Sequence, residues 1–258
     1  MIVQYDGRPA TTEDLAPLAF AGYAHFTAAQ VRGGGIRGLD LHLARLRTQS
    51  MVLFGHALPD DRMRSYLRSA VEASPADASL MAFVHQQAGD DGELDVLVRT
   101  GPAAHGPDGP LALTAVEHER YLPAVKHVGE VAKTHLMRQA VAQGYDDAAF
   151  VDRKGRISEA TIWNLAFWDG AAVVWPEAEV LSGITMQVLR RQLQRLGVPQ
   201  RQQEITPADV PELSGAVVMN SWTPGVAVRR IGEAPVPDAP DFLALLHRAY
   251  DAEPLVAP

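Results

Sequence analysis

The chain has 258 residues and 47% of them are hydrophobic, so it can bury a core; it has no cysteine, which excludes disulfides, thiolate metal sites and thiol nucleophiles. Its 31 acidic and 23 basic residues give a net charge of −8, which argues against general nucleic-acid binding. No apolar run approaches the ~18 residues of a membrane span, and the N-terminus lacks the basic lead and apolar core of a signal peptide. We therefore expect a cytoplasmic enzyme or binding protein.

The first hundred residues are predicted to form a small domain that mixes strands and helices. A helix is expected over residues 39–54, because Leu39, Leu43 and Leu46 recur at near-helical spacing. The other elements expected here are a second helix over residues 60–73 and strands over residues 2–5, 23–31, 80–85 and 93–99, the last two joined by a turn at residues 89–92.

A linker is predicted over residues 101–110, where glycine and proline dominate and no apolar periodicity is present. It divides the chain into a small N-terminal domain of residues 1–100 and a larger C-terminal domain of residues 111–258. The mixture of strands and helices on both sides predicts an α+β fold with two domains.

The larger domain is predicted to alternate strands with helices. The expected strands cover residues 111–116, 148–151, 164–168, 171–175, 216–220 and 226–231, and the expected helices cover residues 129–143, 184–196 and 242–250. In the first of these helices, we expect Val131 and Ala140 to face inward. The nine histidines show no metal-ligand spacing, so no metal site is predicted.

Three features of the larger domain occur in an order that suits pyridoxal phosphate. Lys126 precedes a helix, Glu159 follows 33 residues later, and Gly183 leads into another helix. A lysine can form a Schiff base with the cofactor aldehyde, an acid can keep the ring nitrogen protonated, and a helix N-terminus can bind phosphate. Each residue also has an ordinary structural interpretation: a surface lysine, a solvent-facing glutamate and a plain helix start. Lys133 is the competing lysine, because it lies inside the same helix.

Segments around these residues resemble the class IV (fold type IV) pyridoxal-phosphate enzymes, which include branched-chain and D-amino acid aminotransferases and 4-amino-4-deoxychorismate lyase. The resemblance rests on GRISEATIWNLAF around Glu159, on LSGIT before residue 186, on HFTAAQVRGGGIRGLDLHLARL from residue 25, and on MNSWTPGVAV from residue 219. It implies a two-domain α+β fold of type IV, pyridoxal 5'-phosphate as cofactor, and a homodimer.

The resemblance also implies the roles of individual residues. Lys126 would form the Schiff base, and Glu159 would hold the ring nitrogen. The cofactor phosphate would be bound by Arg45, Ile184, Thr185, Asn220 and Ser221. Phe26, Arg99 and Arg32 are the candidates for contacts with the substrate. His42 is interpreted as a packed helix residue and Asn164 as a residue that anchors a turn or sheet.

Two departures from the family pattern bear on the reaction. The tyrosine that aminotransferases place five residues after the lysine is Val131 here, and the arginine after Gly-Ile-Thr is Met186. The leading interpretation is an aminotransferase that moves an amino group between an amino acid and a 2-oxo acid. The alternatives are β-elimination of the aminodeoxychorismate lyase type with the same cofactor, and a non-catalytic homologue.

Overall fold

The structure is a computed structural model that describes residues 1–20, 22–86 and 92–258. It divides into two compact units. The first comprises Met1–Ala104, Val125–Gly129 and Pro254–Pro258, and the second comprises His105–Ala124 and Glu130–Glu253. The linker predicted two domains that are each a continuous stretch of the chain. The first compact unit is instead made of three stretches, because residues 125–129 and 254–258 pair with its strands.

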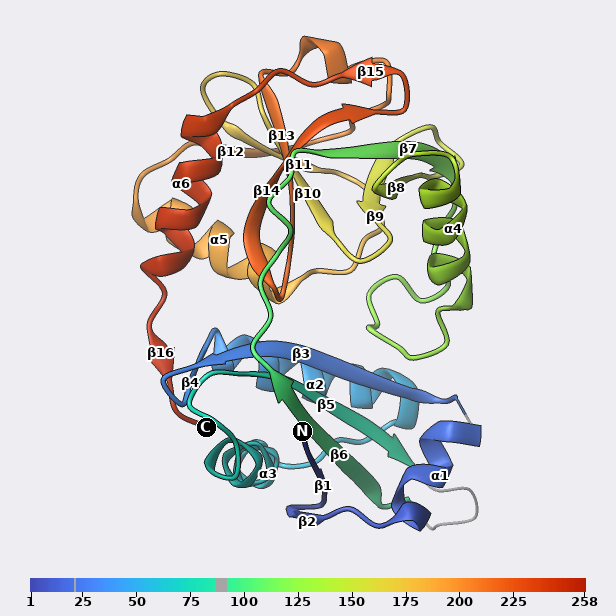
Figure 1. Ribbon diagram of the computed structural model, residues 1–258, viewed down its shortest axis with the longest axis vertical. Coiled ribbons are helices and arrows are strands. Elements are labelled where there is room, and N and C mark those ends of the chain that lie inside the picture. Colours follow the sequence, from blue (N-terminus) through green and yellow to red (C-terminus); the bar gives the residue numbers. More distant parts are fainter. Residues whose placement is uncertain (21, 87–91) are drawn as a thin grey trace. The chain divides into compact units, whose positions relative to one another are not determined.

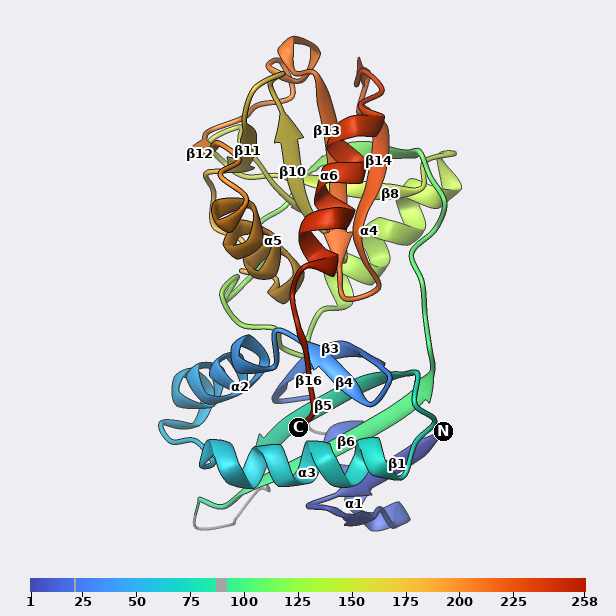
Figure 2. The same ribbon diagram turned by 90° about the vertical axis from the view of Figure 1, so that its left-hand side faces the viewer.

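The first unit is a seven-stranded sheet that two of its three helices cover on one face (Figures 1 and 2). Its strands are β1 (Ile2–Tyr5), β2 (Arg8–Pro9), β3 (Ala24–Arg32), β4 (Gly35–Arg37), β5 (Ala78–Gln86), β6 (Leu94–Pro102) and β16 (Leu255–Val256), in the order β16-β4-β3-β5-β6-β1-β2. Its helices are α1 (Thr12–Phe20), α2 (Leu39–Phe54) and α3 (Asp60–Glu72). Figure 2 shows α2 and α3 lying on the same side of this sheet.

The core of the first unit explains which face the helices cover. Alternate residues of β3 such as Ala29 and Val31 are buried against Leu43 and Leu46 of α2. The intervening residues of β3, among them Phe26, therefore lie on the opposite face of the sheet. The predicted β5–β6 pair is confirmed, whereas most of its expected turn, residues 89–91, lies outside the described residues.

The second unit is built on a nine-stranded sheet that closes on itself. Its elements are β7 (Leu111–Glu117), α4 (Val131–Ala142), β8 (Asp147–Val151), β9 (Ile157–Ala160), β10 (Asn164–Trp168), β11 (Val173–Pro176), α5 (Ile184–Arg195), β12 (Gln200–Gln203), a 3₁₀ turn (Val210–Glu212), β13 (Gly215–Asn220), β14 (Thr223–Ile231), β15 (Ala234–Pro235) and α6 (Pro240–Asp251). Because β9 pairs with both β8 and β10, the strands β10-β13-β14-β7-β8-β9 form a closed ring. The result is a barrel-like sheet.

Side chains fill both sides of this barrel wall. Leu113, Phe167 and Val218 point into its apolar interior, while their neighbours Ala166 and Val217 face helices α5 and α6. Figure 1 shows these two helices on one side of the barrel and α4 on the other. The barrel thereby holds the ends of β9, β10 and β13 in a fixed arrangement.

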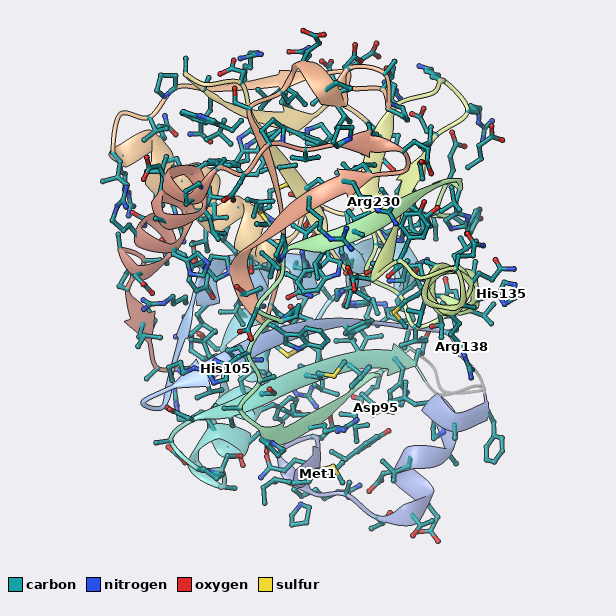
Figure 3. The ribbon with its side chains drawn as sticks, turned by 45° about the horizontal axis from the view of Figure 1, so that its top comes forward. Met1, Asp95, His105, His135, Arg138 and Arg230 are labelled. Atoms are coloured by element: carbon teal, nitrogen blue, oxygen red, sulfur yellow. The ribbon has the colours of Figure 1, made fainter. Side chains whose placement is uncertain are left out.

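Helix α4 differs from the expectation. Only Ala140 is buried in it, and Val131, which was expected to face inward, is 82% exposed. Figure 3 shows His135 and Arg138 of this helix at the periphery of the molecule. The helix contacts β8 along a narrow strip, because Ala140 and a partly buried Leu136 are enough to cover Phe150. No helix among the described residues is long and apolar enough to span a membrane.

Candidate active site

The backbone around Lys126 is bound to the edge of strand β3. The Phe26 N–H donates to the Lys126 carbonyl at 2.8 Å, and the Val128 N–H donates to the Ala24 carbonyl at 3.0 Å. On the other side, the Lys126 N–H donates to Oε1 of Gln49, a buried residue of α2, at 3.2 Å. Three hydrogen bonds from two elements therefore fix the position from which the Lys126 side chain starts.

The Lys126 side chain reaches the face of the sheet that α2 and α3 leave uncovered. Its Nζ lies 4.8 Å from the centre of the Phe26 ring, a cation–π distance. Arg99 lies on the same face, because Ala28, two residues from Phe26, pairs with Met81, which in turn pairs with Arg99. The structure thus brings Lys126 and Phe26 into contact and places exposed Arg99 along the same face.

Arg32 is engaged elsewhere. Its guanidinium donates to the Ala104 carbonyl at 2.9 Å, to the Val31 carbonyl at 2.9 Å and to Gln30 Oε1 at 3.1 Å. These bonds tie the end of β3 to the segment that follows β6. They favour a structural role for Arg32 over a contact with substrate.

Arg45 lies in a buried polar cluster between α2 and β3. His42 Nδ1 and Thr27 Oγ1 are 2.7 Å apart, and His25 Nε2 and Ser50 Oγ are 2.8 Å apart. Burial, together with the smaller effect of the positive charge of Arg45, lowers the pKa of His42 to about 3 and that of His25 to about 4. His42 is therefore packed, as the sequence predicted, and its low pKa makes it neutral; the cationic group of the cluster is Arg45.

Glu159 is a buried carboxylate with a buried cationic partner. Glu159 is 6% exposed, and its Oε1 accepts a hydrogen bond from Arg120 Nη1 at 3.1 Å. The Arg120 side chain is 3% exposed. Burial raises the pKa of Glu159, and the charge of Arg120 is the largest influence that opposes this rise. Glu159 is therefore not the solvent-facing glutamate of the ordinary interpretation.

Arg120 contacts more than Glu159. Its Nε donates to Glu130 Oε1 at 2.9 Å, and its Nη1 donates to the Pro123 carbonyl at 3.0 Å. Lys133 Nζ lies 3.3 Å from Glu130 Oε2. Lys133, the competing lysine, is thus an ion-pair partner in this cluster. Removing one partner of a buried ion pair such as Arg120–Glu159 typically lowers the free energy of unfolding by about 3–5 kcal/mol, because the other partner is left as an uncompensated buried charge.

The segment of residues 181–183 connects Glu159 to the start of helix α5. The Leu181 N–H donates to the Glu159 carboxylate. Asn164, which pairs with Glu159 across β9 and β10, donates from Nδ2 to the Leu181 carbonyl at 2.7 Å. A Cβ on Gly183 would overlap Asn164 Oδ1, so glycine is needed there for packing. Asn164 therefore anchors the segment, as predicted.

Helix α5 begins without a side-chain cap. Gly183 is its N-cap residue and makes no side-chain hydrogen bond to the helix. The first backbone N–H groups of a helix have no partner within the helix, and together with the helix dipole they favour an anion. The Thr185 hydroxyl donates its hydrogen to the Asn220 carbonyl at 2.7 Å, so it is not the donor that this residue offers to an anion. What Ile184 and Thr185 offer to an anion is therefore their backbone N–H groups.

The turn after β13 completes this region of the second unit. Asn220 lies at the end of β13, and its Oδ1 accepts a hydrogen bond from the Trp222 N–H at 2.8 Å. Ser221 follows it in the turn. Through the bond between Thr185 and Asn220, this turn is held next to the start of α5.

The predicted residues therefore fall into two groups. Those of the first unit are Phe26, Arg32, Arg45, Arg99 and Lys126, and those of the second are Glu159, Ile184, Thr185, Asn220 and Ser221. Sequence reasoning did not identify Arg120 or Gln49. No local pattern marks them, because their partners Glu159 and Lys126 are 39 and 77 residues away in the chain.

Comparisons with known proteins agree on a family and a fold. The family model described as amino-transferase class IV matches residues 24–231. The branched-chain amino acid aminotransferase from Escherichia coli superposes with a TM-score of 0.83 at 16% identity, covering 97% of this chain and 92% of that one. A hypothetical aminotransferase from Mycobacterium tuberculosis in a PLP-bound form gives 0.82 at 21% identity, covering 98% of each chain.

A putative 4-amino-4-deoxychorismate lyase from Legionella pneumophila gives a TM-score of 0.79 at 18% identity, covering 92% of this chain and 93% of that one. No curated protein sequence matches the chain. At these identities, the structural likenesses establish a shared fold, and that fold is common to proteins named for transfer and for elimination.

Proposed function

Because the chain belongs to the class IV aminotransferase family, we propose that it is a pyridoxal-phosphate enzyme that moves an amino group between an amino acid and a 2-oxo acid. The predicted α+β architecture of fold type IV is confirmed by the structure and its structural neighbours. One observation carries the proposal: the buried Glu159 carboxylate is hydrogen-bonded to the segment that leads into the uncapped start of α5. A homodimer and a cytoplasmic location stay predictions.

The residues of the second unit fit this cofactor by their chemistry. When bound, the cofactor supplies a protonated ring that accepts electrons from the substrate α-carbon. Glu159 suits the ring nitrogen, because it is a carboxylate with a buried cationic partner, Arg120. The N–H groups of Ile184 and Thr185 suit the phosphate, because a helix N-terminus favours negative charge. Asn220 and Ser221 would border the phosphate on the turn after β13.

Lys126 is proposed to hold the cofactor covalently and to move the proton of the substrate α-carbon through its Nζ. Its backbone is fixed by β3 and by Gln49, so the amine starts from a defined position. Lys133 is less suited to this role, because its Nζ is held in an ion pair by Glu130. Arg45 belongs to the first unit and is proposed to supply positive charge for the phosphate.

Arg99 is proposed to bind the substrate carboxylate. It is exposed and shares a sheet face with Phe26, whose ring contacts Lys126 Nζ. An arginine fork can bind a carboxylate through two parallel hydrogen bonds. Arg32 is the weaker candidate, because its guanidinium donors are bonded to Gln30, Val31 and Ala104.

Elimination is the second candidate function, and one observation favours it. The position five residues after Lys126, where aminotransferases have a tyrosine, is Val131, and its side chain is 82% exposed. This position therefore offers the cofactor no phenol. Elimination uses the same lysine and acid but needs a leaving group on the β-carbon of the substrate.

The test is to follow the amino nitrogen. The purified protein with pyridoxal phosphate is incubated with isotope-labelled amino acids and unlabelled 2-oxo acids, and the new amino acids are analysed by mass spectrometry. We expect the label to appear in a new amino acid, and to be lost with Lys126→Ala. If no donor transfers label while aminodeoxychorismate yields pyruvate and 4-aminobenzoate, elimination replaces transfer as the function.

A further inference from the structure

Arg120 occupies a position that the proposed chemistry leaves unexplained. Its buried guanidinium bonds Glu159 Oε1 at 3.1 Å, the Pro123 carbonyl at 3.0 Å and Glu130 Oε1 at 2.9 Å. Surface ion pairs contribute little to stability, but this side chain is 3% exposed, and its partners lie in strand β9 and in the segment between β7 and α4. The fold therefore gives the Glu159 carboxylate a specific, buried cationic partner.

The charges around Glu159 are balanced. Arg120 and Lys133 are the cations that face it, and Glu130 is the second anion, bonded to both of them. His118 interacts electrostatically with Arg120 and Glu130. Burial lowers the pKa of His118, so this residue adds no charge at neutral pH. The two cations and two anions cancel, and the Leu181 N–H is the neutral donor to the Glu159 carboxylate.

A buried carboxylate by itself is poorly suited to hold a proton on a ring nitrogen. Burial disfavours the charged form of Glu159, which raises its pKa and makes it a stronger base. A proton shared between two bases lies on the stronger one. Without a cationic partner, Glu159 would tend to keep the proton itself, and the ring nitrogen would stay neutral.

We propose that Arg120 is a positioning residue that keeps Glu159 ionised and oriented, so that the shared proton resides on the ring nitrogen of the cofactor. Glu130, supported by Lys133, holds Arg120 in place and cancels its charge. The inference rests on the proposed function, because it assigns Arg120 a role in the same cofactor site. It adds a residue that acts through Glu159 and does not itself touch the cofactor.

The first measurement follows Glu159 in the full-length protein without added cofactor. The protein carries isotope-labelled glutamate carboxyl carbons, and Glu159→Gln identifies the resonance of Glu159 in the NMR spectrum. We expect Arg120→Gln to raise the pKa of Glu159 by about 1–3 units, the usual influence of a neighbouring arginine. Arg120→Lys keeps the charge but loses the planar fork, so we expect a smaller rise.

Arg153→Gln is the matched control. Arg153 donates to Glu119, which directly precedes Arg120, but its side chain is 82% exposed. The control therefore removes a neighbouring ion pair of similar chemistry without touching the buried cluster. We expect the titration of Glu159 to be unchanged in this variant.

The second measurement follows the ring nitrogen in the protein loaded with nitrogen-labelled pyridoxal phosphate. We expect a protonated ring nitrogen in the wild type and a shift toward the neutral form in Arg120→Gln. If Arg120→Gln does not fold, Arg120→Lys provides the same test, with a smaller shift in the same direction. Unchanged Glu159 titration and an unchanged ring nitrogen in the folded variants would overturn the inference.

The two proposals fail in different ways. If the wild-type protein binds no pyridoxal phosphate, the proposed function fails and the role of Arg120 at the ring falls with it, whatever the Glu159 titration shows. If the cofactor binds and its amino transfer is seen, but the ring nitrogen does not respond to Arg120→Gln, only the inference about Arg120 is overturned.

Discussion

Lys126 is positioned by its backbone before any ligand contributes. The Phe26 N–H and Gln49 Oε1 hold the lysine peptide from opposite sides, at 2.8 and 3.2 Å. A long flexible side chain loses up to ~2 kcal/mol of rotamer entropy when it is fixed, so an anchored starting point reduces the conformations that must be excluded. This preorganisation is what the proposed covalent role of the amine requires.

Another property of single residues is the buried, neutral state of His42. Its folded-state pKa of about 3 lies below the value of 6.5 expected without burial. Neutral His42 therefore contributes its full stabilisation above pH 6.5. This contribution is lost progressively as the pH falls from 6.5 toward the folded-state pKa of about 3. Between about pH 7.5 and pH 5, we expect His42 to account for a loss of about 2 kcal/mol in the free energy of unfolding.

Urea unfolding of the wild type and His42→Asn at these two pH values checks this. Asparagine keeps a polar atom near the position of Nδ1, which contacts Thr27 Oγ1. We expect the variant to lose about 2 kcal/mol less than the wild type on acidification. His135→Asn, on the exposed face of α4, is the control. Equal pH dependence in wild type and His42→Asn would mean that His42 is not buried and neutral.

At the scale of elements, the start of α5 depends on contacts made by strand β10. Gly183 has an extended backbone, with φ −60° and ψ 143°, which alanine can also adopt. The added Cβ would nevertheless overlap Asn164 Oδ1. We expect Gly183→Ala to displace residues 181–183, to lower the free energy of unfolding by about 1–3 kcal/mol and to weaken pyridoxal phosphate binding.

The measurements are urea unfolding and titration with pyridoxal phosphate followed by fluorescence. Gly101→Ala is the matched control, because a Cβ there meets nothing within 4 Å. If Gly183→Ala binds the cofactor as the wild type does and is equally stable, Asn164 does not fix the start of α5.

The elements that the sequence predicted well are those with a strong local pattern. The helix expected over residues 39–54 is α2, and the strands expected over residues 2–5 and 164–168 are β1 and β10. Helix α1 was missed, because it has only nine residues and contains Pro17. The short strands β2, β4, β12, β15 and β16 have two to four residues each, too few to show a local periodicity. Two of them, β12 and β16, also pair with strands that are distant in the chain.

At the scale of the whole molecule, sequence motifs and long-range contacts supply different parts of the site. The residues proposed to touch the cofactor could be predicted, because each lies in a segment with a recognisable order of residues. Their supports could not, because Arg120 and Gln49 act on partners that only the tertiary fold brings close. The predicted inward orientation of Val131 was wrong for a related reason. Helix α4 packs on β8 through a strip narrower than the number of its apolar residues indicated.

The central claim is that Lys126 binds pyridoxal phosphate covalently, and the composition of the chain makes this simple to test. The sequence contains three lysines, Lys126, Lys133 and Lys154, and the last is exposed in the turn between β8 and β9. The protein is incubated with pyridoxal phosphate, reduced with borohydride, digested and mapped by mass spectrometry. We predict the reduced cofactor on Lys126, retained in Lys133→Ala and lost in Lys126→Ala. A label on Lys133 or Lys154, or no label on any lysine, would contradict the account.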